Sequence, residues 1–422
     1  MDRQRIAIIG SGISGLTSAY LLNKCHDITV FEANDYIGGH THTVPVDING
    51  RELWIDTGFI VCNDRNYPNF LQLMSQAGIN LQATEMSFSV SNPASNLEYN
   101  GHNLNTLFAQ RRNLLRPRFI KLVRNILRFN SAARSANADP GSTSSTLGEF
   151  VESLNLGEEL KEDYLYPMVA AIWSCSTRQA SEFPLQFFLK FFLNHGLLDI
   201  KNRPQWYVLQ GGSHSYINPL IAGFRGQVKL DCKVQRITRR ETGVSLHMTD
   251  QDGEHTEKFD QVIIACHSDQ ALRMLSDPTP EESAVLGAIG YQENDVILHS
   301  DASIMPKNKR AWASWNFLAG ATNSNEAPVI TYCMNILQGL TEQEPLLVTL
   351  NGRDKIAPDR ILQEFSYSHP VYSTDALMAQ TQRNSICGSN RTHYCGAYWY
   401  NGFHEDGVRS ALDVCARFGT RL

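Results

Sequence analysis

Short apolar runs alternate with amphipathic stretches along this chain, most clearly at its beginning. Residues 5–9 are apolar after the first position, which is typical of a buried strand. Residues 16–24 have the composition of a helix, and residues 28–31 form a second apolar run. This order predicts a βαβ unit, in which two parallel strands flank one helix.

The same pattern predicts the rest of the fold in outline. Apolar runs at 53–55, 228–237 and 259–266 predict buried strands, and 295–299 and 329–334 alternate as strands do. Residues 63 to about 205 mix polar and apolar positions and predict mostly helices. The stretch 183–198, rich in Phe and Leu, predicts a packing helix, with a lipophilic pocket wall as the sharper alternative.

A glycine motif lies between the first strand and the first helix. Gly10 permits a tight turn, Gly12 lets the backbone approach a pyrophosphate, and Gly15 lets the helix pack on the strand. Ile13 and Ser14 follow at the helix N-terminus, where unpaired N–H groups favour phosphate. The motif in this context predicts a dinucleotide site.

An acidic residue narrows the choice of dinucleotide. Glu32 ends the second strand, 22 residues after Gly10, where a carboxylate accepts hydrogen bonds from ribose hydroxyls. It would repel a 2′-phosphate, so FAD and NAD remain.

Composition bounds the class of protein. The 422 residues suggest two domains, and a net charge of −6 shows no bias toward nucleic acid. We expect no membrane-spanning run and no signal peptide. Nine scattered cysteines without a CxxC pair favour free thiols in the cytoplasm and no structural zinc.

A second fingerprint follows Glu32: Ala33, a short loop, then Gly38, Gly39 and His40. It resembles the flavin amine oxidase superfamily, which includes monoamine oxidases, protoporphyrinogen oxidase and carotenoid desaturases. Those enzymes usually have Gly-Gly-Arg here. With His40 at this position, the chain instead resembles a bacterial subgroup of predicted NAD/FAD-binding oxidoreductases, often encoded near cyclopropane-fatty-acid synthases. Stretches 310–316 and 402–407 resemble the same subgroup. The resemblance spans nearly the whole chain.

The resemblance implies FAD and an α/β fold with a discontinuous Rossmann-type FAD domain (1–62, 205–270 and 386–422). We expect the FAD to be held non-covalently, since no cysteine has a recognised flavin-linking context. The α+β substrate domain would comprise 63–204 and 271–385. Further implied cofactor contacts are Ala33, His40, Thr57, Gly58, Val234 and the start of the last helix, Glu405, Asp406, Gly407 and Val408. For Thr57 and Gly58, an ordinary turn is the alternative.

Few residues suggest chemistry beyond the flavin's own. Many relatives have a lysine near flavin N5, but none occurs between residues 274 and 306, where His299 is a candidate proton relay or a structural histidine. Tyr398, Trp399 and Tyr400 should approach the flavin, with core packing as the alternative. His40 and His42 lack a third metal ligand nearby, so we expect no metal site.

These features predict an oxidoreductase that transfers hydride from a substrate C–H bond to flavin N5. The subgroup resemblance and the apolar helices favour a lipid-like substrate. The alternatives are an amine oxidase and a non-catalytic flavin-binding scaffold for lipid-modifying enzymes. The electron acceptor and the oligomeric state stay open.

One stretch adds a possible partner. Residues 100–137 hold eight Lys or Arg and no acid, which leaves −14 on the rest of the chain because the whole carries −6. Phe119, Leu122, Val123, Ile126 and Leu127 share one predicted helix face, and Lys121, Arg124 and Arg128 lie opposite. A solvated basic face is the ordinary reading. The sharper hypothesis is that Arg111–Arg134 contacts anionic lipid at the inner membrane face.

Overall fold

The computed structural model describes residues 3–137, 146–173, 175–199, 201–224, 226–320 and 328–422. The predicted βαβ unit is confirmed as β1 (Arg5–Ile9), α1 (Ile13–Leu22) and β2 (Asp27–Phe31). The two strands pair in parallel, with Ile8 opposite Val30. Both of these side chains are fully buried, which explains the continuous apolar character of the two runs.

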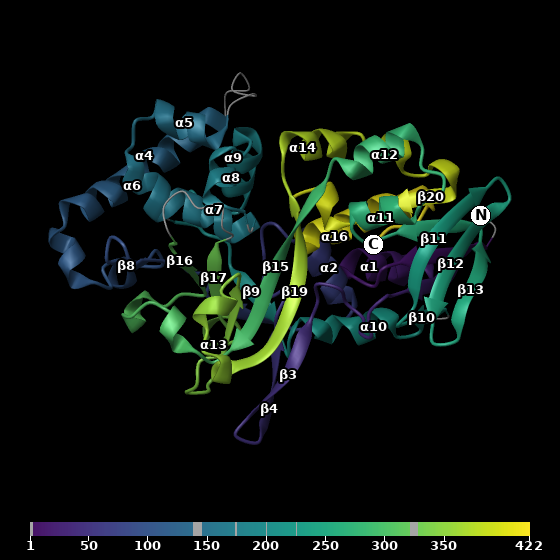
Figure 1. Ribbon diagram of the computed structural model, residues 1–422, viewed down its shortest axis with the longest axis horizontal. Coiled ribbons are helices and arrows are strands. Elements are labelled where there is room, and N and C mark those ends of the chain that lie inside the picture. Colours follow the sequence, from purple (N-terminus) through teal and green to yellow (C-terminus); the bar gives the residue numbers. More distant parts are fainter. Residues whose placement is uncertain (1–2, 138–145, 174, 200, 225, 321–327) are drawn as a thin grey trace.

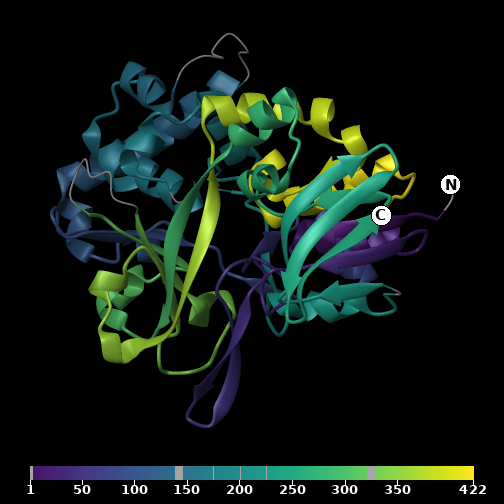
Figure 2. The same cartoon turned by 45° about the vertical axis from the view of Figure 1, so that its right-hand side comes forward.

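Five parallel strands from three distant parts of the chain form one sheet, in the order β10-β2-β1-β14-β20. The added strands are β10 (Gln227–Lys229), β14 (Gln261–Ile264) and β20 (Thr392–Tyr394). An antiparallel sheet of β11 (Lys233–Arg240), β12 (Gly243–Asp250) and β13 (Gly253–Phe259) stands beside it (Figure 2). The strands expected at 228–237 and 259–266 are thus confirmed.

A second large sheet has the order β19-β15-β18-β17-β16-β7-β8. Its strands are β7 (Phe88–Asn92), β8 (Leu97–Asn100), β15 (Gly290–His299), β16 (Trp315–Leu318), β17 (Val329–Cys333), β18 (Leu347–Leu350) and β19 (Ile361–Val371). The strands expected at 295–299 and 329–334 are confirmed. The helical reading of 63–205 is wrong for 81–100, because β6 (Leu81–Thr84), β7 and β8 are strands there.

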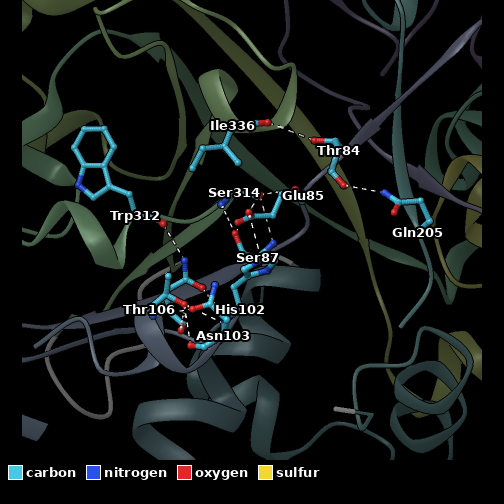
Figure 3. A network of polar contacts seen from close by, with 11 residues as sticks. Thr84, Glu85, Ser87, His102, Asn103, Thr106, Gln205, Trp312, Ser314 and Ile336 are labelled. Carbon is cyan, nitrogen blue, oxygen red and sulfur yellow. Dashed lines mark hydrogen bonds and ion pairs between the residues drawn. The ribbon is translucent and has the colours of Figure 1, made fainter. Parts of the chain in front are cut away.

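The remaining strands form two smaller sheets. One is the hairpin of β3 (Thr43–Ile48) and β4 (Arg51–Asp56), which projects from the body of the molecule in Figure 1. The other consists of β5 (Cys62–Asn63), β9 (Trp206–Leu209) and β6. A polar network fixes the chain between β6 and β7 (Figure 3). Ser314 Oγ donates to Glu85 O at 2.6 Å, and Ser314 N donates to Ser87 Oγ at 3.0 Å. These bonds anchor β7 beside β16.

Helices cover both large sheets (Figure 1). They are α2 (Pro68–Gln76), α3 (Leu104–Leu107), α4 (Pro117–Asn137), α5 (Leu147–Ser153), α6 (Glu158–Leu160), α7 (Tyr166–Trp173), α8 (Thr177–Ser181), α9 (Leu185–Asn194), α10 (Ile217–Ile221), α11 (Ser268–Met274), α12 (Pro280–Gly287), α13 (Met334–Leu337), α14 (Thr374–Thr381), α15 (Arg383–Ile386) and α16 (His404–Arg417). Helices α4 to α9 gather beyond one edge of the seven-stranded sheet, and the last helix, α16, packs against α1. In the described ranges, no helix is long and apolar enough to cross a bilayer.

The fold class is as expected: α/β, with a Rossmann-type parallel sheet and an α+β part around the second sheet. Separate apolar cores support this arrangement. One joins the parallel sheet to β11–β13, and another lies among the helices of residues 117–198. The domain boundaries set out above remain a prediction.

Candidate functional site

The glycine turn has the geometry that a dinucleotide requires. Gly10 has φ +102°, a conformation that favours glycine, and a Cβ on Gly15 would lie 2.0 Å from Gly10 O. Gly12 differs from both, because its backbone is extended (φ −64°, ψ 176°) and a Cβ there would meet only Gly38 O, at 3.8 Å. The protein therefore leaves space at Gly12, where a pyrophosphate would approach.

Glu32 is buried at the end of β2, beside this turn. Its Oε2 accepts from Ser11 N at 2.9 Å and from Ser11 Oγ at 2.7 Å, and its Oε1 accepts from Asn34 N at 3.0 Å. The three bonds fix the carboxylate at the carboxyl end of the sheet, where open α/β sheets bind ligands. Ser11 was absent from the predicted site, because a serine within a glycine-rich turn gives no separate signal.

Two loops meet at the second fingerprint. Phe59 N donates to His40 O at 2.7 Å and Thr57 N donates to His42 O at 2.9 Å. A Cβ on Gly58 would lie 2.2 Å from His40 O, so only glycine allows this approach. The Gly-Gly turn also lies close to the first motif, since a Cβ on Gly39 would lie 3.2 Å from Gly12 Cα.

The N-terminus of the last helix adjoins that of the first. Ser14 Oγ donates to Gly407 O at 3.0 Å, and a Cβ on Gly407 would lie 2.6 Å from Ile13 Cγ2. Val408 is fully buried behind them. Two helix N-termini, each with a partial positive charge, therefore meet on one side of the glycine turn and favour an anionic ligand.

Two acids at the start of α16 have structural partners. Glu405 accepts from Phe70 N at 2.8 Å and from Asn69 Nδ2 at 2.5 Å, which caps helix α2. Asp406 accepts from Phe403 N at 2.9 Å and so caps its own helix. Burial raises the pKa of the Asp406 carboxyl to about 7. Contact of these two acidic side chains with the cofactor remains a prediction.

Two further predicted contacts lie on either side of Glu32. Cys232 N donates to Glu32 O at 2.8 Å, which places the start of β11, and with it the buried Val234, alongside the end of β2. Ala33 follows Glu32 directly and is exposed. Both positions adjoin Glu32, and their contact with the cofactor remains a prediction.

A group of histidines surrounds His40. Its ring lies 5.8 Å from that of His267, 5.6 Å from that of His369 and 5.5 Å from that of Tyr367, and its Nε2 has no hydrogen-bond partner in the described protein. Burial lowers the pKa of His267 to about 4 and that of His369 to about 3, so both rings are neutral. In the part of the chain that the structure describes, no three His, Cys, Asp or Glu side chains could hold a metal ion.

His267 and His369 were missed in the sequence, because they lie more than 200 residues from His40 and belong to no local motif. His404 is a further case. It stacks on Phe59 with ring centres 3.6 Å apart, and its Nε2 lies 2.9 Å from Thr41 Oγ1.

The predicted catalytic residues lie in different surroundings. His299 is fully buried, with Nε2 2.7 Å from Thr349 Oγ1 and Nδ1 accepting from Asp301 N at 3.1 Å. His299 and Gln292 are seven residues apart on β15, which at 3.3 Å per residue is about 23 Å. Gln292 pairs with His369, so His299 lies at the strand end away from the histidine group. Its role as a proton relay stays a prediction, which the proposals below do not use.

The three neighbouring aromatics mainly pack. Tyr398 and Trp399 are buried in the core of the parallel sheet, while Tyr400 donates to Asp413 Oδ2 at 2.6 Å and lies under Arg409. Neither Tyr398 OH nor Trp399 Nε1 has a hydrogen-bond partner among the described residues. A direct approach of this cluster to the flavin therefore also stays a prediction.

Another aromatic group lies at the N-terminus of α16. Phe403 stacks on Phe191 of α9 with ring centres 5.2 Å apart, and His195 stacks on Phe191 at 3.8 Å and lies 5.8 Å from Phe403. Phe187 of the same helix stacks on Tyr372 at 5.0 Å. The stretch 183–198 thus forms an aromatic wall beside the last helix; we call Phe187, Phe191, Tyr372 and Phe403 the aromatic wall.

The glycine turn, Glu32 and the paired helix N-termini fit FAD. They supply open space for a pyrophosphate at Gly12, backbone donors for its charge and a fixed carboxylate for a ribose. When bound, FAD supplies two-electron redox chemistry, and the protein orients it and tunes its electrostatics.

Comparisons with known proteins agree with this site. The model of the family of flavin-containing amine oxidoreductases matches residues 13–354. A tryptophan 2-monooxygenase of Allorhizobium ampelinum is 51% identical over 43 residues, which are 10% of this chain and 6% of that protein, so the match spans a small part of that relative.

Two solved structures cover 98% of this chain and 98% of their own, each with a TM-score of 0.68 and 15% identity. They are a CLA-producing fatty acid isomerase from P. acnes and a cyclohexylamine oxidase from Brevibacterium oxydans. At this identity they show a shared fold. With the family model matching most of its length, the chain belongs to the flavin-containing amine oxidoreductases and is an FAD-dependent oxidoreductase.

Proposed function

We propose that this enzyme oxidises a lipophilic, fatty-acyl-like substrate. A hydride would pass from a substrate C–H bond to bound FAD and a proton to solvent, and a C=C bond would form in the substrate. The aromatic wall carries the proposal, because it places apolar side chains beside the start of α16. Phe187 and Phe403 are only half-buried, so part of this apolar surface is available to a ligand. The electrons then pass to oxygen or to another acceptor.

The residues around the wall have distinct roles in this proposal. The N–H groups at the start of α16 would stabilise negative charge that FAD gains when it is reduced. Tyr372 OH is buried without a hydrogen-bond partner in the described chain and lies against Gly402, where it can donate to a polar group of the substrate. Burial lowers the pKa of His195 to about 4, so its ring adds no positive charge to the wall.

Oxidation of an amine is the second candidate, favoured by the family and by the amine oxidase among the similar structures. Two features argue against amine oxidation. Residues 275–305 contain no lysine, and His299 lies at the end of β15 that is away from His369. None of the four side chains of the aromatic wall is a carboxylate, and the neighbouring Asp406 carboxylate accepts from Phe403 N as a helix cap. We therefore expect simple primary amines to be poor substrates.

The test is anaerobic reduction of the FAD-loaded enzyme by three compounds: a long-chain acyl lipid, an alkylamine of equal chain length and a short monoamine. The proposal predicts rapid bleaching by the acyl lipid and slow bleaching by both amines. Rapid bleaching by both amines, with none by the lipid, would establish the amine oxidase. If none of the compounds bleaches the flavin, the acyl substrate class is wrong.

A further inference from the structure

Exposed leucines gather in one segment of the helical part. Nine large apolar side chains of the described residues are exposed, and five belong to residues 104–127: Leu104 (75%), Leu114 (52%), Leu115 (89%), Ile120 (45%) and Leu127 (47%). Single exposed apolar residues are ordinary, but a concentration of them marks an interaction site. We call these five side chains, with Arg124 and Arg128, the leucine–arginine surface.

The outward face of α4 shows how this surface is built. Phe119 and Leu122 are buried as expected, and the helix packs through that side on α6 and α9. Leu127, expected on the buried face, is instead 47% exposed, because it lies at the edge of the apolar stripe. Ile120, Arg124, Leu127 and Arg128 follow the spacing i, i+4, i+7, i+8, so apolar and basic side chains share the exposed face.

Part of the basic charge is compensated within the protein. Lys121 Nζ lies 2.7 Å from Glu159, Arg118 lies 3.1 Å from Asp163, and Arg134 pairs with Asp199 at 3.8 Å. Five arginines of the segment make no ion pair with any described residue: Arg111, Arg112, Arg116, Arg124 and Arg128. The surface therefore keeps a net positive charge next to its leucines.

We propose that the leucine–arginine surface docks the enzyme on an anionic lipid bilayer. Arginine pairs well with phosphate oxygens, and the exposed leucines would enter the boundary between headgroups and acyl chains. The chain outside residues 100–137 carries −14, so attraction to the bilayer is local to this part of the molecule. Docking needs no spanning helix and does not depend on which substrate the flavin oxidises.

The experiment is flotation of the full-length, FAD-loaded enzyme with vesicles of phosphatidylcholine alone or mixed with phosphatidylglycerol, at low and high salt. Arg124→Gln with Arg128→Gln removes two charges, and Leu115→Ser with Leu127→Ser removes two apolar contacts. Controls change exposed residues elsewhere: Arg236→Gln with Arg240→Gln, and Leu362→Ser, whose side chain is 39% exposed.

We expect binding to the anionic vesicles at low salt and much weaker binding to phosphatidylcholine. Each arginine near an anionic surface contributes about 1 kcal/mol to the binding free energy, or about fivefold in affinity. The double arginine variant should therefore bind the anionic vesicles about 25-fold more weakly. The leucine variant should also lose binding, and both controls should keep it. Equal binding to both vesicles, no binding, or equal losses in the controls would overturn the proposal. So would a wild-type dimer in solution that the leucine variant converts to a monomer, because a second copy would then cover this surface.

Discussion

Replacement of Gly12 by valine should prevent FAD binding and leave the fold of the protein unchanged. Its extended backbone (φ −64°, ψ 176°) suits any residue, and the nearest atom to a Cβ, Gly38 O, would be 3.8 Å away. Gly12→Val should therefore change the stability of the cofactor-free protein by no more than about 1 kcal/mol. The open space that admits the side chain is the space that a pyrophosphate needs.

The expected loss falls on FAD. A valine at position 12 would hold the pyrophosphate away from the helix N-terminus and remove one or two charge-assisted hydrogen bonds. At about 1.5–3 kcal/mol each, their loss weakens binding by about 1.5–6 kcal/mol, or on the order of 10–10⁴-fold. Gly15→Ala should act differently, because its Cβ would lie 2.0 Å from Gly10 O and disturb the fold itself.

The assay has two readouts: FAD released from the purified protein by denaturation, and the melting temperature of the cofactor-free form. Gly290→Val is the matched control, since Gly290 has open space around it and no positive φ. We expect Gly12→Val to be folded and colourless and Gly290→Val to be folded and yellow. A folded Gly12→Val protein with a full complement of FAD would refute the assignment of this turn.

Three further outcomes follow. Glu282→Ala should cost about 3–5 kcal/mol in urea unfolding, because Arg239 loses a buried partner at 2.5 Å; a cost below about 1 kcal/mol would show that the pair is dispensable. Asp406→Asn should stabilise the cofactor-free protein at pH 8 but not at pH 4. Burial raises the pKa of the Asp406 carboxyl in the folded protein to about 7, so the wild-type protein loses stability as the pH rises toward that value and the variant does not. The same difference in melting temperature at both pH values would contradict this. Tyr372→Phe should keep the melting temperature and weaken reduction by a polar-headed substrate about tenfold; unchanged reduction would remove Tyr372 from the site.

The nucleotide-binding part could be predicted because its signals are local. The apolar runs before and after Gly10–Gly15, and the acid at Glu32, all lie within one βαβ unit. The structure confirms each element within a few residues. The chain supplies the same kind of local signal at 259–266, where β14 continues the sheet.

The rest of the site depends on pairing between distant segments. Gln292 of β15 pairs with His369 of β19, and this register brings His369 beside His40. No property of the sequence near His40 reports that neighbour. The role of His299 stays a prediction, since the composition of a strand does not say which distant segments lie beside each of its ends.

Strands β7 and β8 were missed for a related reason. Ser89 and Ser91 flank Val90, and this mixture of polar and apolar residues predicts a helix as readily as a strand. The serines are buried because β7 lies inside the sheet between β16 and β8. A period of two at Phe88 and Val90 was present, but over only five residues.

The most direct test of the account is a single turnover without oxygen, in which the FAD-loaded enzyme is mixed with one equivalent of a long-chain acyl lipid. The flavin absorbance and the product mass are then recorded together. We predict complete bleaching and a product that has lost two hydrogen atoms. A product of unchanged mass with the flavin still oxidised would show a redox-neutral isomerisation, and would contradict the proposed oxidation of a lipophilic substrate.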